Sequence, residues 1–229
     1  MKYAVVTGGA SGIGKSIVRM LINHEYFVYS LDITTSDLKH ANIKNVQLDI
    51  TNGEQIISFI ATMHSIDLLI NNAAIQIEKH FIEQSIESIE KVLMTNLVGT
   101  ITFTRRLLTS MHKDSLILNV GSIHGSIPRK NKIPYDISKA GLDMFTKELA
   151  LELAPSIRVN SLNIGATETP MNDIFKHNPL SRQDALKKIP LNHIFEPDEI
   201  AQVISHLIND DFKYMTGSIV VYDSGRSLI

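Results

Sequence analysis

The 229-residue sequence contains no cysteine, which excludes disulfides, thiolate metal sites and cysteine nucleophiles. It also lacks any apolar run near the roughly 18 residues of a membrane helix. The apolar run at residues 3–6 breaks at glycine and is too short for a signal peptide. The net charge is only −2, so nothing indicates nucleic acid or an anionic membrane as a partner. We therefore expect a cytoplasmic protein with neither kind of partner.

Metal binding is not indicated either. The nine histidines occur singly, and none has a second histidine four residues later. Such a pattern is typical of surface or core histidines rather than of metal ligands. The chain length fits one α/β domain, and 44% apolar and 20% charged residues are ordinary for a globular protein.

Short apolar segments alternate along the chain with segments of helical spacing. The apolar segments predict strands at 3–7, 27–31, 46–48, 66–70, 115–120, 157–162 and 217–222. The others predict helices at 11–23, 52–63, 86–111 (interrupted near Asn96), 135–153 and 197–208. We expect residues 166–195 to be irregular, because they contain three prolines. This alternation predicts one α/β domain over residues 1–229, with a mainly parallel sheet covered by helices on both faces.

A glycine-rich turn joins the first predicted strand to the first helix, and it reads Thr7-Gly8-Gly9-Ala10-Ser11-Gly12-Ile13-Gly14. Glycine at positions 8, 12 and 14 allows a tight turn and a close approach of the backbone to a pyrophosphate. The amides at the helix N-terminus favour the same anion. A purely structural turn is the alternative, but the position between strand and helix favours dinucleotide binding.

Asp32 lies 18 residues after Gly14, at the end of the second predicted strand. A carboxylate there can accept hydrogen bonds from both hydroxyls of an adenosine ribose, and it would repel a 2′-phosphate. No arginine follows it, so the sequence favours NAD over NADP. Lys15 and Lys39 are the residues that argue the other way. The alternative for Asp32 is a solvated loop acid.

Tyr135 and Lys139 are four residues apart on a predicted helix, which places both on one face. A free phenol has a pKa of about 10, too high for an efficient base near neutrality. A neighbouring ammonium would lower that pKa. The pair alone is a weak signal, and its weight comes from Ser122, which ends a predicted strand 13 residues earlier.

Together these residues resemble the short-chain dehydrogenase/reductase family, over essentially the whole chain. The family's adenine-contacting acid corresponds to Asp49, and its Asn-Asn-Ala-Gly motif reads Asn71-Asn72-Ala73-Ala74. Its C-terminal Asp-Gly-Gly appears as Asp223-Ser224-Gly225. The family's four catalytic residues fall on Asn96, Ser122, Tyr135 and Lys139.

The resemblance implies a doubly wound Rossmann sheet and a proton-transfer mechanism. Tyr135 would exchange a proton with the substrate oxygen, which Ser122 would hold by a hydrogen bond. Lys139 would bind the nicotinamide ribose and lower the tyrosine pKa, and Asn96 would hold a water in a proton relay. The implied cofactor-binding residues are Gly8, Ser11, Gly12, Ile13, Gly14, Asp32, Asp49, Ile50, Asn72, Ala73, Ala74, Tyr135, Lys139, Gly165, Thr167 and Thr169. Relatives usually form tetramers or dimers, so we expect a homo-oligomer.

The sequence departs from the family pattern in three places. Ile164 precedes Gly165 where proline is usual, and Ala74 stands where glycine is usual. Only 16 residues separate Asp32 from Asp49, so we expect a shortened or missing helix there. For Thr167 and Thr169 a structural turn is the alternative.

The stretch around 166–195 is the predicted substrate lid. Its basic residues favour either an anionic substrate or a solvated helix face. These lid residues, with the aromatic that accompanies them, are Phe175, Lys176, His177, Arg182, Lys187 and Lys188. His124 and Arg129 belong either to the pocket or to a surface loop.

The function we predict is hydride transfer between NAD and the carbonyl or secondary alcohol of a small molecule. A catalytically silent NAD-sensing protein is the alternative, and the intact catalytic set argues against it. An epimerase or dehydratase that holds NAD tightly would be expected to carry a larger C-terminal domain. Sugar or polyol, 3-oxoacyl and steroid-like substrates all remain open.

Overall fold

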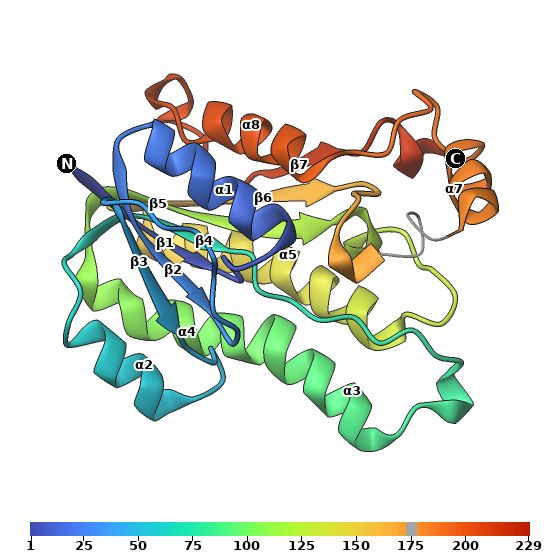
Figure 1. Cartoon of the computed structure of the whole chain (residues 1–229), viewed down its shortest axis with the longest axis horizontal. Helices are drawn as coiled ribbons and strands as arrows, with labels where there is room; N and C mark the ends of the chain where they lie inside the picture. Colours follow the sequence, from blue (N-terminus) through green and yellow to red (C-terminus); the bar gives the residue numbers. More distant parts are fainter. Residues whose placement is uncertain (173–177) are drawn as a thin grey trace.

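Seven parallel strands form one sheet in the computed structural model, which describes residues 1–172 and 178–229. The strand order is β3-β2-β1-β4-β5-β6-β7, and each neighbouring pair is parallel (Figure 1). The order and direction confirm the predicted doubly wound α/β fold. The strands are β1 (Lys2–Thr7), β2 (Tyr26–Asp32), β3 (Ile43–Gln47), β4 (Ile66–Asn71), β5 (Met111–Ser122), β6 (Ile157–Ile164) and β7 (Ile219–Tyr222).

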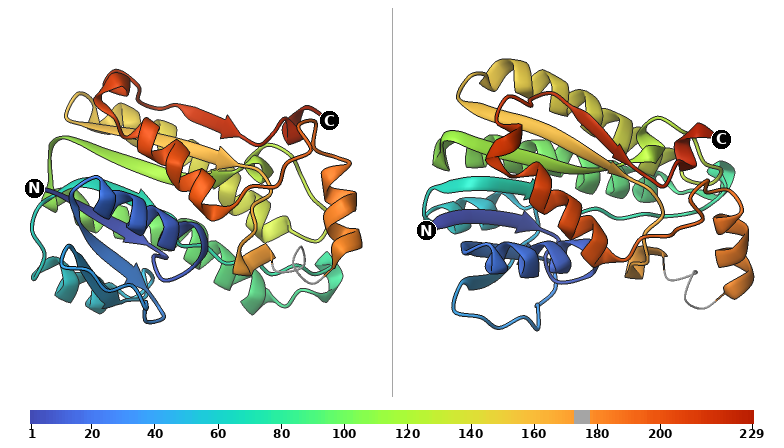
Figure 2. Two further views of the ribbon diagram at one scale, coloured as in Figure 1. Left: turned by 45° about the horizontal axis from the view of Figure 1, so that its top comes forward. Right: turned by 90° about the horizontal axis from the view of Figure 1, so that it is seen from above.

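Helices cover both faces of the sheet (Figures 1 and 2). One face carries α1 (Gly12–Asn23) and α8 (Pro197–Leu207). The other carries α2 (Gly53–Ile60), α4 (Thr100–Leu107) and α5 (Ile133–Leu153), with α3 (Ile86–Leu93) packed against α5.

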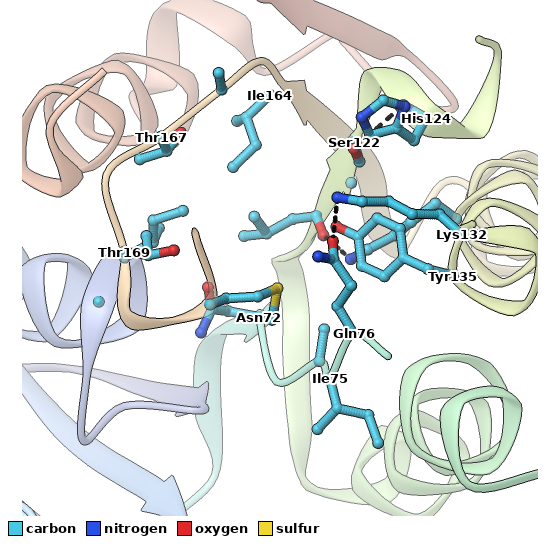
Figure 3. Close-up of a pocket in the computed structure, with 18 of the residues that line it drawn as sticks. Asn72, Ile75, Gln76, Ser122, His124, Lys132, Tyr135, Ile164, Thr167 and Thr169 are labelled. Atoms are coloured by element: carbon cyan, nitrogen blue, oxygen red, sulfur yellow. Dashed lines mark hydrogen bonds between the residues drawn. The ribbon is translucent and has the colours of Figure 1, made fainter. Parts of the chain in front are cut away.

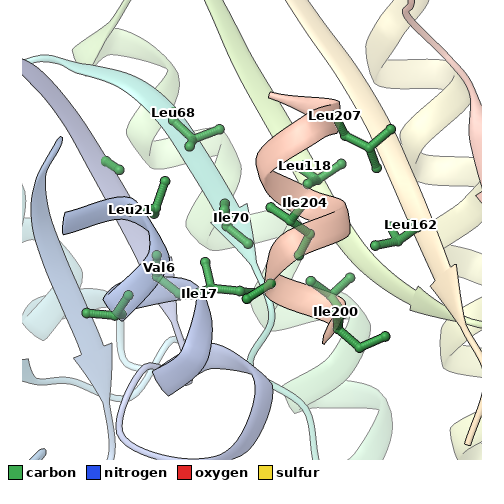
Figure 4. Close-up of a cluster of buried hydrophobic side chains, with 14 of the residues drawn as sticks. Val6, Ile17, Leu21, Leu68, Ile70, Leu118, Leu162, Ile200, Ile204 and Leu207 are labelled. Atoms are coloured by element: carbon green, nitrogen blue, oxygen red, sulfur yellow. The ribbon is translucent and has the colours of Figure 1, made fainter. Parts of the chain in front are cut away.

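Two hydrophobic cores lie between these layers, because successive strand residues point to opposite faces. On β1, Val6 packs in the core under α1 and α8, together with Ile17 and Ile204 (Figure 4). The next residue back, Val5, packs in the opposite core with Phe103 of α4. Burial on both faces explains why the strands read as continuous apolar runs rather than as alternating ones.

The sheet also places the site. β1 has β2 on one side and β4 on the other, so the strand order reverses at β1. Ligands in such sheets bind beyond the carboxyl ends of the strands at this reversal. The glycine turn follows β1, Asn71 ends β4, and Ser122 ends β5, so all three lie at this edge.

Several boundaries differ from the predictions. β3 begins at Ile43 and β5 at Met111, earlier than expected, because polar residues such as Lys44 and Lys113 hide the exposed starts of these strands. Residues 33–42, between β2 and β3, contain no helix, which confirms the prediction of a shortened or missing one.

The 86–111 segment is interrupted as predicted, by a π-helical turn at Met94–Gly99 that separates α3 from α4. The prediction that 166–195 is irregular was wrong for α7 (Pro179–Leu186). Asn178 caps this helix by accepting a hydrogen bond from the amide of Ser181. Proline at the first helical position starts a helix rather than breaking one. Phe175, Lys176 and His177 of the predicted lid lie outside the described residues. No helix within 1–172 or 178–229 is both long enough and apolar enough to span a membrane.

Candidate active site

A cavity of about 740 Å³ opens at the carboxyl ends of the strands. Gly8, Gly12 and Asp32 line one end of it. Ser122 and Tyr135 line the other (Figure 3). The fold therefore brings the predicted cofactor residues and most of the predicted catalytic residues to one cavity.

The glycine turn is tied to the end of β4 by Asn72. The Asn72 Nδ2 donates to the carbonyl oxygens of Thr7, at 2.9 Å, and Gly8, at 3.2 Å. The Thr7 hydroxyl in turn accepts from the amides of Asn72 and Ala73, at 3.0 and 3.1 Å. Gly8 has a φ of +69°, and a Cβ there would lie 2.8 Å from the Asn72 amide nitrogen. Asn72 thus shapes the turn in addition to lining the cavity.

The first turn of α1 meets the requirements of a pyrophosphate site. Ser11 precedes the helix and makes no side-chain capping bond, so no N-cap side chain occupies the first amides. Gly12 and Ile13 line the cavity beside those amides. A Cβ on Gly14 would overlap the carbonyl oxygen of Gly8, so glycine is required for the close packing of helix on turn. Unpaired amides at a helix N-terminus attract an anion.

Asp32 is held at the end of β2 in the cavity wall. Its Oδ2 accepts from the Ala10 amide at 3.0 Å, and its Oδ1 accepts from the amide and hydroxyl of Thr34, both at 3.0 Å. These bonds fix the carboxylate while leaving lone pairs for a ribose. Lys15 forms an ion pair with Asp37 at 2.6 Å and does not line the cavity. The pairing lowers the pKa of Asp37.

Asp49 and Ile50 line the same cavity as Asp32, and their contact with a cofactor stays a prediction. The Asp49 Oδ1 accepts from the amide and the hydroxyl of Thr51, at 2.8 and 2.7 Å. On the opposite wall lie Ala73 and Ala74, which follow β4.

Ser122, Tyr135 and Lys139 meet at the other end of the cavity. Ser122 ends β5, and its side chain lies close enough to the Tyr135 hydroxyl to oppose the rise of the Tyr135 pKa. Tyr135 is in the first turn of α5 and Lys139 in the second. The Lys139 Nζ donates to the carbonyl oxygen of Val120 at 2.8 Å and lies 5.7 Å from the centre of the Tyr135 ring.

Burial dominates the acid–base behaviour of this pair. Tyr135 is only 9% exposed and Lys139 only 4%. Burial raises the pKa of Tyr135 to about 12, against an opposing effect of the Ser122 side chain. Burial also lowers the pKa of Lys139 to about 8. Lys139 is not among the groups that act on the pKa of Tyr135 in the chain alone, so the expectation that Lys139 lowers that pKa stays a prediction.

Asn96 is not brought to the cavity. It is 2% exposed, within the π-helical turn. Its Oδ1 accepts from the Ile75 amide at 2.8 Å, and its Nδ2 donates to the Ile75 carbonyl at 2.9 Å and to the Ser138 hydroxyl at 3.1 Å. Ser138 donates to the carbonyl of Tyr135 at 2.6 Å. The side chain therefore braces the segment after β4 and the start of α5, and the water relay stays a prediction.

The segment after β6 forms a further wall of the cavity. Ile164, Gly165, Thr167 and Thr169 all line it. A Cβ on Gly165 would lie 2.8 Å from the Cα of Asp223, so glycine is needed where this segment passes the end of β7. The side chain of Ile164 points toward the cavity, in the place where the family usually has proline (Figure 3).

The sequence analysis missed Lys132 and Gln76. Lys132 is 2% exposed, lines the cavity and donates to the Gln76 Oε1 at 2.7 Å. Its position three residues before Tyr135, one helical turn away, was the available signal. His124 and Arg129 also line the cavity, which decides between the two interpretations given for them.

The described basic residues of the lid divide into two groups. Arg182 pairs with Glu168 at 2.9 Å, and Lys187 pairs with Asp184 at 3.0 Å. Lys188 lines the cavity. Within the described ranges, no three or more histidine, aspartate or glutamate side chains are grouped to hold a metal ion.

Comparison with known proteins decides the family. Residues 8–227 match a family model described as enoyl-(acyl carrier protein) reductase. The chain belongs to the short-chain dehydrogenase/reductase family of oxidoreductases. It is 31% identical to glucose 1-dehydrogenase 2 of Bacillus subtilis, with 99% of this chain and 95% of that protein covered. It is 33% identical to the 3-oxoacyl-acyl-carrier-protein reductase of Thermotoga maritima, with 98% and 97% covered.

A solved structure described as 4-hydroxyisoleucine dehydrogenase complexed with NADH superposes with a TM-score of 0.94. The two chains are 27% identical and cover each other fully. These three relatives differ in the substrates that their names give. Family membership therefore leaves the substrate of this chain to be argued from its own cavity.

Proposed function

We propose that this chain is an NAD-dependent dehydrogenase or reductase that interconverts a secondary alcohol and a carbonyl group on a small molecule. The observation that carries the proposal is that Ser122, Tyr135 and Lys139 line one end of a cavity whose other end is the glycine turn. Bound NAD supplies the hydride acceptor, or in its reduced form the donor.

The predicted site residues then have defined tasks. The amides at the start of α1 hold the pyrophosphate, and the Asp32 carboxylate accepts from the ribose hydroxyls. Ser122 holds the substrate oxygen, and the Tyr135 hydroxyl donates a proton to it or takes one from it. Lys139 binds the nicotinamide ribose. Lys139 is 4% exposed, so burial around the ring excludes bulk water from the proton transfer.

Two observations favour NAD over NADP. The Asp32 carboxylate ends β2 and lines the cavity, and a carboxylate beside the adenosine ribose would repel a 2′-phosphate. Lys15, the nearest basic candidate in the sequence, is engaged by Asp37. The experiment follows the absorbance of reduced cofactor with both cofactors across a panel of alcohols and ketones. Turnover with NAD supports the proposal, whereas cofactor binding without turnover on a broad panel would favour the sensing alternative.

We also propose that the protein is a homo-oligomer formed through α5. Three large apolar side chains on this helix, Ile137, Met144 and Leu151, are 55%, 55% and 78% exposed. They are seven residues apart, so they form one stripe along the helix. A second copy packed on that stripe would remove it from water. Light scattering on the purified protein tests this, and a monomer at micromolar concentration would contradict it.

A further inference from the structure

The cavity holds a buried ammonium that the proposed proton transfer does not use. The side chain of Lys132 is 3% exposed. Taking a charge out of water costs several kcal/mol unless it is paired and hydrogen-bonded. Burial, the largest cause, and the neighbouring Arg129 together lower the pKa of Lys132 to about 8.

The charge of Lys132 is only partly compensated. Its Nζ donates to the neutral amide oxygen of Gln76 at 2.7 Å. The carboxylate that pairs with it, on Glu78, is 3.7 Å away and 45% exposed to solvent. This distance is longer than a hydrogen bond, and solvent screens the charge of a carboxylate that is so exposed. An ammonium has three donor hydrogens, so Lys132 retains the capacity to bind a second anion.

Gln76 adds a second donor beside it. Because an ammonium only donates, the amide oxygen of Gln76 must face Lys132, which leaves the amide nitrogen to donate elsewhere. Figure 3 shows this nitrogen turned toward the open middle of the cavity. His124 differs, because its Nδ1 is 3.1 Å from the carbonyl of Ile127 and must donate there. Burial lowers the pKa of His124, and the neutral ring then offers only an acceptor at Nε2.

Most of the charges around this end of the cavity have the same sign as Lys132. Among the described lining residues here, Asp184 is acidic, and it is outnumbered by basic ones. These are Arg129, Lys130, Lys132, Lys188 and Arg226. The acids Asp32 and Asp49 lie at the cofactor end. A cavity lined by one sign of charge attracts ligands of the other sign.

We propose that Lys132 and Gln76 bind a carboxylate of the substrate, so that the enzyme oxidises short hydroxy acids or reduces the corresponding oxo acids. The ammonium and the amide nitrogen would each donate to one carboxylate oxygen, in charge-assisted hydrogen bonds. A single buried ammonium and one amide match a monoanion better than a phosphate, which usually takes arginine or several backbone donors.

The geometry also limits the length of the acid. The Lys132 Nζ is 5.9 Å from the centre of the Tyr135 ring. A substrate that places its reacting oxygen on the Tyr135 hydroxyl and its carboxylate on Lys132 has only a few carbons between the two groups. In the oxidation, the carbinol carbon loses a hydride to NAD and the hydroxyl loses its proton through Tyr135. The carboxylate is unchanged.

This inference rests on the proposed function, and the experiment separates the two. The substrates are hydroxypentanoates with the hydroxyl on the second, third or fourth carbon, their methyl esters, and 2-pentanol. We expect at least one acid to have a kcat/KM about 100-fold above that of its ester, and Lys132→Met to remove most of that difference through KM. Gln76→Leu should cost the acid about 10-fold. The esters should lose much less than the acids in either variant, and Lys113→Met, at an exposed lysine near the start of β5, should change neither.

A binding measurement completes the test. Pentanoate, which cannot react, is titrated into the enzyme with NADH while the cofactor fluorescence is followed. Saturable binding that is lost in Lys132→Met supports the carboxylate site even if no alcohol is oxidised, an outcome that would overturn only the proposed reaction. Turnover of esters as fast as acids, or equal pentanoate binding in folded Lys132→Met, overturns the carboxylate site. A thermal melt checks folding, and methionine at a buried lysine is expected to be tolerated.

Discussion

Lys139 and Tyr135 lie on successive turns of α5, with the ammonium 5.7 Å from the centre of the phenol ring. Yet the Lys139 Nζ donates to the carbonyl oxygen of Val120, while Ser122 is the β5 residue whose side chain acts on the pKa of Tyr135. The two side chains therefore project from one helix face toward different residues of β5. The arrangement leaves the Tyr135 hydroxyl at the reacting end of the cavity, still protonated at neutral pH because burial raises its pKa to about 12.

Removing this hydroxyl is the sharpest test of the proton transfer. We expect Tyr135→Phe to lower kcat about 10²- to 10⁴-fold, the usual range for losing a general acid or base. NAD affinity should change little, because the ring and the glycine turn remain. Steady-state kinetics and a cofactor titration measure the two effects. Tyr214→Phe is the matched control, since Tyr214 is 91% exposed. A Tyr135→Phe enzyme with normal kcat would exclude this residue as the proton donor.

We expect the choice between NAD and NADP to depend on Asp32. We expect Asp32→Ala to weaken NAD binding about 10-fold, because the ribose loses its charged acceptor, and to improve NADP binding, because the repulsion disappears. The ratio of the two dissociation constants is the quantity to measure, and Asp211→Ala, on an exposed turn, serves as the control. Unchanged preference in Asp32→Ala would show that other groups select the cofactor.

The sequence predicted the sheet, its direction and the residues at both ends of the cavity, because burial on both faces and a glycine turn leave local patterns. It did not predict the start of β3, where Lys44 and Asn45 face outward, nor α7, whose proline begins a helix. The sequence also did not predict that the pKa of Tyr135 is raised, since desolvation depends on segments that are distant in the sequence and pack against α5. Gln76 and Lys132 are 56 residues apart, and nothing local in either segment indicates that they touch.

Asn96 stands at a catalytic position of the family, yet its side chain has a structural role here. We expect Asn96→Ala to reduce the free energy of unfolding by about 2–3 kcal/mol, because both backbone groups of Ile75 lose a buried partner. Chemical denaturation measures this change. Asn45→Ala, which removes an exposed hydrogen bond to the Leu38 carbonyl, should cost much less. Equal losses in the two variants would show that the Ile75 contacts contribute little to stability.

The lowered pKa of Lys132 predicts a pH dependence for acid substrates that neutral substrates do not share. The groups acting on its ammonium are Arg129, which disfavours the charge, and Glu78 and Asp136, which favour it; His124 is also within electrostatic reach. With burial the largest effect, the ammonium of the free enzyme loses its proton as the pH rises through about 8. The carboxylate would then face a neutral amine.

We therefore expect the KM for a hydroxy acid to rise above pH 8, while the KM for its methyl ester stays level over the same range. Bound acid favours the charged form, so the rise should appear in KM, which reflects the free site, before it appears in kcat. If the KM for the acid and the KM for the ester change with pH in parallel, the assignment is contradicted. In Lys132→Met, the KM for the acid should be high at every pH.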